Sequence, residues 1–116
     1  MKPVFMPAEF TERQSAFDLS PNGENRILLR VVYRPKSRSL EKFTVILISE
    51  IDGKKCELFR ADGSMREHAH VHYKFKNPPR KEYQNKEIAY QTVRDYIELI
   101  RTNWRWFLAQ YKENYK

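Results

Sequence analysis

The sequence predicts an α+β domain, in which about four antiparallel strands form a meander and one long C-terminal helix packs on one face. Two observations lead to this fold class. Between residues 26 and 75, runs rich in β-branched and aromatic residues alternate with short turn-like links. After residue 85, apolar residues recur at the spacing of a helix. A chain of 116 residues is long enough for one such domain with a modest core.

Residues 1–25 contain Pro3, Pro7 and Pro21, together with the turn-like stretch "SPNGEN". Proline fixes φ and removes a backbone donor, which disfavours regular structure. We expect a loosely ordered N-terminal arm here and a single domain over residues 26–116.

Four strands are expected at residues 26–34, 41–51, 54–61 and 66–75. The pairs Asp52-Gly53 and Asp62-Gly63 are typical of hairpin turns, and they are predicted to separate the second, third and fourth strands. The fourth strand is expected to end before Asn77-Pro78-Pro79.

A helix is predicted over about residues 86–112, with Asn85 as its N-cap. Its apolar stripe needs a partner, and the sheet is the only candidate. The stripe contains Val93, Ile97, Ile100, Trp104, Phe107, Leu108 and Tyr111.

The net charge of +7 and the pI near 9.6 indicate an anionic partner, most often nucleic acid. We expect RNA rather than DNA, although many basic proteins bind no anion. The single cysteine, Cys56, excludes an internal disulfide and suits a reducing compartment. With no apolar run of signal-peptide or membrane-spanning length in the sequence, we expect a cytoplasmic protein without a membrane partner.

All three histidines, His68, His70 and His72, lie in the stretch "REHAHVHYKF". Successive side chains of a strand point to opposite faces, so the histidines share the open face. The same row contains the cations Arg66, Lys74 and Lys76, while residues 67, 69, 71, 73 and 75 form the mostly apolar row toward the helix.

Three interpretations of this row compete. The histidines can supply an acid and a base for metal-independent cleavage of a phosphodiester, with Arg66, Lys74 and Lys76 as phosphate contacts. They can bind a metal, although on a regular strand His68 and His72 are about 13 Å apart, so only two neighbours can share an ion. They can also be the polar outer face that an antiparallel sheet needs.

Glu57 is the carboxylate expected to orient the histidines, because a two- or four-residue turn at Asp62-Gly63 would set it opposite His68 or His70. A three-residue turn would remove it from that face, and the sequence does not fix the register.

A cationic ridge is predicted along one side of the helix, where it could follow a phosphate backbone or simply face solvent. It consists of Arg94, Arg101, Arg105 and Lys112.

The antiparallel strands, the "ADG" stretch, the cluster "HAHVH" in the next strand and the terminal helix together resemble the small TumE-like toxins of bacterial toxin–antitoxin pairs. The resemblance covers about residues 26–110, with motif-like detail over 57–76, and a "His-His-Pro" element is missing. It implies a growth inhibitor that acts on RNA and is neutralised by a cognate antitoxin, with His68, His70 and His72 as its functional cluster.

The first functional prediction is therefore a nucleic-acid-directed protein, a toxin-like ribonuclease that needs no cofactor and no metal. His68, His70 and His72 would be the catalytic residues, with Glu57 as the group that orients them. The alternatives are a non-catalytic module that docks nucleic acid or protein, and a metal-binding hydrolase. A homodimer is compatible with any of them.

Overall fold

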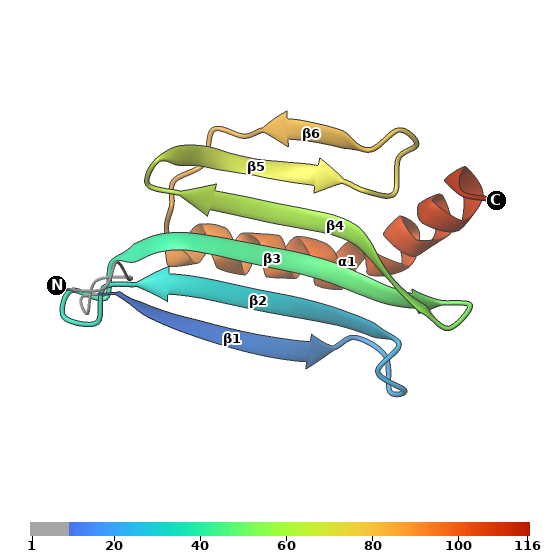
Figure 1. Cartoon of the computed structure of the whole chain (residues 1–116), viewed down its shortest axis with the longest axis horizontal. Coiled ribbons are helices and arrows are strands. Elements are labelled where there is room, and N and C mark those ends of the chain that lie inside the picture. The colour runs from blue at the N-terminus through green and yellow to red at the C-terminus, as the bar shows by residue number, and fades with distance from the viewer. Residues whose placement is uncertain (1–9) are drawn as a thin grey trace, which may run out of the picture.

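The computed structural model describes residues 10–116, which form one six-stranded antiparallel sheet with a single helix. Each strand pairs with the next along the chain, in the order β1-β2-β3-β4-β5-β6 (Figure 1). The strands are β1 (Thr11–Asp18), β2 (Asn25–Tyr33), β3 (Leu40–Ile51), β4 (Lys54–Ser64), β5 (Glu67–Tyr73) and β6 (Arg80–Tyr83).

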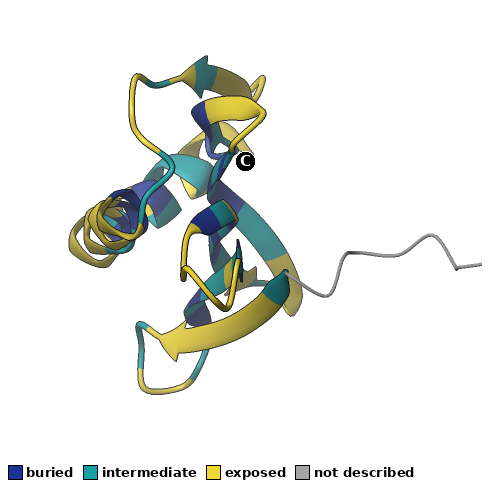
Figure 2. Ribbon diagram, turned by 90° about the vertical axis from the view of Figure 1, so that its left-hand side faces the viewer, coloured by how far each residue is buried: buried dark blue, intermediate teal, exposed yellow. Residues whose placement is uncertain are grey.

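The helix α1 (Tyr90–Asn114) runs along one face of the sheet, mainly over β3 and β4. It turns its buried side to the strands (Figure 2). Phe107 stacks on both Phe59 of β4 and Phe75, with ring centroids 5.2 and 5.1 Å apart. The other face of the sheet is left without a covering element among the described residues, and it faces the viewer in Figure 1.

The predicted class, an antiparallel sheet with one C-terminal helix, is confirmed. The four predicted strands correspond to β2, β3, β4 and β5. The hairpin at Asp52-Gly53 is also confirmed, and both residues have positive φ, 52° and 77°. Those angles match the right-handed twist of the two strands that the turn joins.

The predicted number of strands is wrong, because the sheet has six. Residues 11–18 of the predicted arm form β1, which pairs with β2 from Thr11↔Tyr33 to Asp18↔Arg26. Residues 12–17 are exposed, so backbone hydrogen bonds define this edge strand and no apolar alternation marks it. The part of the arm at residues 1–9 lies outside the described residues.

The second additional strand, β6, comprises only four residues, "RKEY", directly after Pro78 and Pro79. It pairs with β5 through His70↔Tyr83 and His72↔Lys81. Pro79 lies before the strand, so its missing backbone N–H does not interrupt the hydrogen bonds between β5 and β6.

Asp62-Gly63 is not a turn. β4 continues through both residues to Ser64, and Met65-Arg66 forms the link to β5. Gly63 is buried, and a Cβ at this position would lie 2.6 Å from atoms of both Ile88 and Phe43. Close packing on the helix side of the sheet therefore requires glycine at position 63.

The helix begins at Tyr90, four residues later than predicted, and ends at Asn114. Its N-cap is Ala89, which has an extended backbone, so the prediction of Asn85 as the cap is wrong. The predicted stripe is largely confirmed, since Val93, Ile100, Trp104 and Phe107 are buried. Within residues 10–116, no helix combines the length and apolar character needed to cross a membrane.

Candidate functional site

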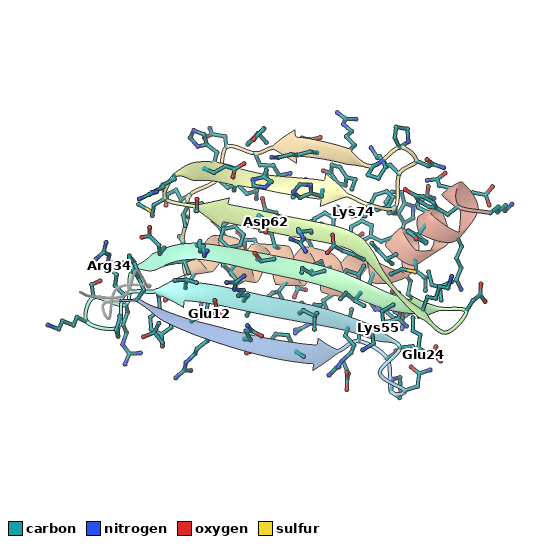
Figure 3. All side chains as sticks on the ribbon, viewed as in Figure 1. Glu12, Glu24, Arg34, Lys55, Asp62 and Lys74 are labelled. Carbon is teal, nitrogen blue, oxygen red and sulfur yellow. The ribbon has the colours of Figure 1, made fainter. Side chains whose placement is uncertain are left out.

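One row of side chains crosses the open face from β3 to β6. The pairings Thr44↔Asp62, Asp62↔His70 and His70↔Tyr83 place these four residues side by side on neighbouring strands. His72 lies one step along β5, opposite Arg60 and Lys81. Figure 3 labels Asp62 in the middle of the sheet on β4. The register of β4 with β5 therefore sets a carboxylate against the histidines.

Asp62, His70 and His72 converge on a common point. The Oδ2 atom of Asp62 lies 3.4 Å from Nε2 of His72 and 3.7 Å from Nε2 of His70. One potential ligand atom from each residue falls within 4.8 Å of the other two. The two imidazole rings meet edge to face, with centroids 5.1 Å apart. We call these three residues the Asp–His–His cluster.

His68 does not belong to the cluster, although alternation predicted one row of three histidines. The register of β4 and β5 shifts between Asp62↔His70 and Ser64↔Glu67, so that His68 and Ala69 oppose the single residue Gly63. Such a bulge interrupts the alternation of faces. His68 is exposed and lines a separate surface hollow with residues 64–67 and 85–88.

Hydrogen bonds outside the Asp–His–His cluster fix the orientation of two of its members. Thr44 donates from Oγ1 to Oδ1 of Asp62 at 2.7 Å, which leaves Oδ2 turned to the histidines. His70 donates from Nδ1 to the backbone carbonyl of His68 at 3.0 Å. Because a carbonyl only accepts, the proton of a neutral His70 is on Nδ1, and its Nε2 lone pair faces Asp62.

Glu67 forms a second carboxylate position beside the cluster. Its Oε1 accepts a hydrogen bond from Tyr83 at 3.1 Å and one from Lys81 at 3.3 Å. The same atom lies 3.7 Å from Nδ1 of His70. The hydrogen bond from Tyr83, and then that from Lys81, lower the pKa of Glu67 below its ordinary value. Glu67 therefore stays ionised next to the ring of His70.

Burial differs between the two histidines, and it affects the protonation of His72. The side chain of His70 is 7% exposed and that of His72 is 24% exposed. Burial lowers the pKa of His72, and the charge of Asp62 opposes this only in part. His72 is therefore neutral at neutral pH, and its nitrogens are available as a base or as ligands.

A surface hollow of about 310 Å³ opens next to the cluster. Asp62, His70 and Glu67 line one side of it, and Arg30 and Lys42 line another. Arg30 is held by Glu12, with 2.7 Å between the guanidinium and the carboxylate, whereas Lys42 makes no ion pair with any residue in 10–116. Close to the Asp–His–His cluster, the lining of the hollow therefore combines the carboxylates of Asp62 and Glu67 with the cation of Lys42.

Glu57 lies on the open face but does not reach the histidines. A bulge in β4 at Leu58 shifts the register, and Glu57 then faces Ile48. Its carboxylate binds Arg60 at 2.8 Å and lies 3.6 Å from Nζ of Lys74. The structure thus brings Asp62, and not Glu57, to the histidines.

The predicted phosphate contacts on β5 are dispersed. Lys74 is on the open face beside Glu57 (Figure 3). Arg66 is in the β4–β5 turn, and Lys76 lies past the end of β5 with its Nζ over the ring of Tyr73. None of the three lines the hollow beside the cluster.

The predicted cationic ridge exists but lies elsewhere. Its four residues are exposed on α1, which covers the face opposite to the histidines. The structure therefore does not bring Arg94, Arg101, Arg105 and Lys112 together with the Asp–His–His cluster.

Four residues of the site were not predicted from the sequence, namely Asp62, Thr44, Glu67 and Tyr83. A signal for Asp62 was present, because Phe59, Ala61 and Gly63 alternate with the polar residues 60, 62 and 64. That alternation extends the strand through the supposed turn. No comparable signal marks Tyr83, which reaches the site only through the pairing of β6.

Comparison of this chain with family models, with curated proteins and with solved structures finds no match. The resemblance to TumE-like toxins therefore stays a prediction from the motif alone, and the function has to be argued from the geometry of the site.

Proposed function

We propose that the Asp–His–His cluster binds a divalent transition metal, with Zn²⁺ as the best fit, and that the protein hydrolyses phosphodiester bonds of nucleic acid there. The observation that carries this proposal is the convergence of the three side chains. Two ligands about 2.0 Å from a tetrahedral zinc ion lie about 3.3 Å apart. The separations of 3.4 and 3.7 Å are close to that value, so small side-chain rotations would complete the site.

The hydrogen bonds around the cluster also support a metal site. Metal-binding histidines usually donate their second ring N–H to a carbonyl or carboxylate, and metal-binding carboxylates are themselves hydrogen-bonded. His70 has the carbonyl of His68, and Asp62 has the hydroxyl of Thr44. Imidazole and carboxylate together suit zinc, and three protein ligands leave a further coordination position for substrate or water.

The hollow next to the cluster suits a phosphodiester. A divalent ion held by the cluster would polarise a phosphate oxygen as a Lewis acid. Lys42 and Arg30 would bind the phosphate charge, and the carboxylate of Glu67 lies on the opposite side of the same hollow. The positive net charge of the chain favours encounter with nucleic acid.

Zinc affinity provides the direct test, measured by competition with a chromophoric chelator. We expect Asp62→Asn and His72→Asn each to lower the affinity by at least about tenfold, the range seen when zinc-site residues are altered. His68→Asn is the matched control, because it removes an imidazole outside the cluster and keeps the carbonyl that His70 uses. Equal affinity in the His68 and His72 variants would refute the metal site.

Cleavage of a labelled single-stranded RNA then tests the reaction. We expect activity that zinc supports, that a chelator removes, and that is lost in His72→Asn while His68→Asn keeps it. Near-ultraviolet circular dichroism of Trp104 and Trp106 would report whether each variant is folded. Zinc binding without cleavage in any tested RNA or DNA would leave the site intact and overturn the proposed reaction.

A metal-independent acid–base reaction at the same residues is the second candidate. It is favoured by one observation, the contact of a single carboxylate, Asp62, with both imidazoles, which would orient an acid and a base together. RNA cleavage that persists in excess chelator and is abolished in folded His70→Ala or His72→Asn would select it over the metal-dependent reaction.

The toxin role implied by the resemblance is also a proposal. It predicts that expression in a bacterial host arrests growth, that Asp62→Asn relieves the arrest, and that a cognate antitoxin neutralises the wild-type protein. Unimpaired growth at high expression would remove this role without affecting the metal site.

A further inference from the structure

A second surface hollow, of about 390 Å³, lies on the helix side of the sheet beside the start of α1. Arg13 of β1 together with Val31 and Tyr33 of β2 form its floor, while the β2–β3 loop and the first residue of the helix close its sides. We call this hollow the Arg–Tyr cleft. It is lined by Arg13, Val31, Tyr33, Pro35, Arg38 and Tyr90.

Within residues 10–116, the two arginines of the cleft have no acidic partner, and no acidic side chain lines the cleft. The arginines of the open face differ in this respect. Arg26, Arg30 and Arg60 each bind a carboxylate at 2.7 or 2.8 Å. Unpaired guanidinium groups in a cleft are free to bind phosphate in a bidentate manner.

The two tyrosines offer flat surfaces. Tyr90 is 37% exposed and Tyr33 is half-buried, and neither ring stacks on another aromatic ring of the described chain. Exposed aromatic rings beside basic groups are the usual elements of sites for single-stranded nucleic acid, because any base can stack on them. The volume lies within the range of ligand-binding clefts.

Positive charge continues from the cleft along both adjoining elements. Lys36 is exposed in the β2–β3 loop, and Arg94 follows Tyr90 by one helical turn, on the same side of α1. Arg94 begins the cationic ridge of the helix. A backbone that leaves the cleft therefore meets further cations.

We propose that the Arg–Tyr cleft binds a short segment of single-stranded nucleic acid, with phosphates on Arg13 and Arg38 and a base stacked on Tyr90 or Tyr33. This inference does not rest on the proposed hydrolysis, because the cleft lies on the helix side of the sheet and shares no lining residue with the Asp–His–His cluster.

The test is fluorescence anisotropy with a labelled oligouridylate of about ten nucleotides, titrated at several salt concentrations. The variant Arg13→Gln/Arg38→Asn removes both charges, and asparagine tolerates the positive φ of 60° at position 38. We expect binding at least about tenfold weaker, and a slope of log affinity against log salt smaller by about 1.4, the value for two phosphate contacts on a single strand.

The matched control is Arg26→Gln/Lys55→Gln, which removes the same charge elsewhere. Lys55 and Arg34 lie at opposite ends of the sheet, as Figure 3 shows. We expect a much smaller loss of affinity and an unchanged slope in this control. If both double variants weaken binding equally, the protein binds RNA through net charge alone and the cleft is not the site.

Variants of Tyr90 separate stacking from charge. Tyr90→Leu should weaken binding about tenfold with an unchanged salt slope, and Tyr90→Phe should restore wild-type affinity. Equal affinity in the leucine and phenylalanine variants would refute stacking on Tyr90, and the same comparison at Tyr33 would complete the test. Displacement of the oligonucleotide by inorganic polyphosphate at equal phosphate concentration would show a site for phosphate charge and overturn the assignment to nucleic acid.

The two proposals fail separately. Asp62→Asn should lower zinc affinity and keep the affinity for the oligonucleotide, while Arg13→Gln/Arg38→Asn should weaken oligonucleotide binding and keep zinc affinity. Loss of oligonucleotide binding in folded, zinc-free Asp62→Asn would place the nucleic acid on the open face and refute the cleft.

Discussion

Replacement of Gly63 by alanine tests the packing that carries Asp62 into the site. Gly63 adjoins Asp62 on β4 and is buried on the helix side. An added Cβ would lie 2.6 Å from Cδ1 of Ile88, and 2.6 and 2.9 Å from two ring atoms of Phe43. Carbon atoms in contact normally lie about 3.5–4.0 Å apart. One of these neighbours, or β4 itself, must therefore move by about 1 Å.

We expect Gly63→Ala to lower the free energy of unfolding by about 1–3 kcal/mol, the usual cost of an overpacked core. The backbone contributes little to this cost, because Gly63 is not among the residues with positive φ. The assay is equilibrium unfolding in urea. A free energy of unfolding within about 0.5 kcal/mol of the wild-type value, as for an ordinary surface substitution, would refute this packing argument. It would indicate that Gly63 lies in an open turn.

A double-mutant cycle identifies the obstacle. Ile88→Val removes the Cδ1 atom, so Gly63→Ala/Ile88→Val should cost at least about 0.5 kcal/mol less than the sum of the two single changes. Gly53→Ala is the control, because a Cβ added at Gly53 would meet no atom within 4 Å and the φ of this residue is 77°. It should cost about 1–2 kcal/mol through the backbone alone, because a Cβ disfavours the left-handed region, and Ile88→Val should not relieve it.

Three further predictions concern the two carboxylates and the core. Thr44→Val removes the hydroxyl that orients Asp62, so we expect zinc affinity to fall about 10–100-fold; unchanged affinity would show that Asp62 needs no such support. Glu57→Gln should keep zinc affinity and change the free energy of unfolding by less than about 1 kcal/mol, because the contacts of Glu57 within residues 10–116 are with the half-exposed Arg60 and Lys74. A loss of zinc binding equal to that of Asp62→Asn would contradict the observed register. Burial raises the pKa of Tyr96 to about 12 from 10.0, so its contribution to stability is complete below pH 10 and is lost as the pH rises toward 12. Between pH 10 and pH 12, the free energy of unfolding of the wild type, measured in urea, should fall by up to about 3 kcal/mol more than that of Tyr96→Phe. The same pH dependence in both proteins would refute this.

The sequence determined the fold class and most of the helix-side core of this protein. β-Branched and aromatic runs marked β2, β3, β4 and β5, and the stripe of residues at helical spacing marked the buried face of α1. These features depend on how each residue relates to its neighbours along the chain. Local patterns of this kind can be recognised without knowing which distant residues of the chain they contact.

Only the tertiary structure decided the membership of the site. The register of β4 with β5 set Arg60 and Asp62, rather than Glu57, opposite the histidines, and a bulge opposite Gly63 removed His68 from their row. A shift of one residue in the register moves the side chains of a strand to the opposite face of the sheet. The free energy of that shift depends on contacts with other strands. The edge strands β1 and β6 escaped prediction for a related reason, because exposed strands are held by backbone hydrogen bonds that leave little trace in side-chain pattern. Asp62 therefore meets His70 and His72 through pairing between strands, which no stretch of the sequence specifies by itself.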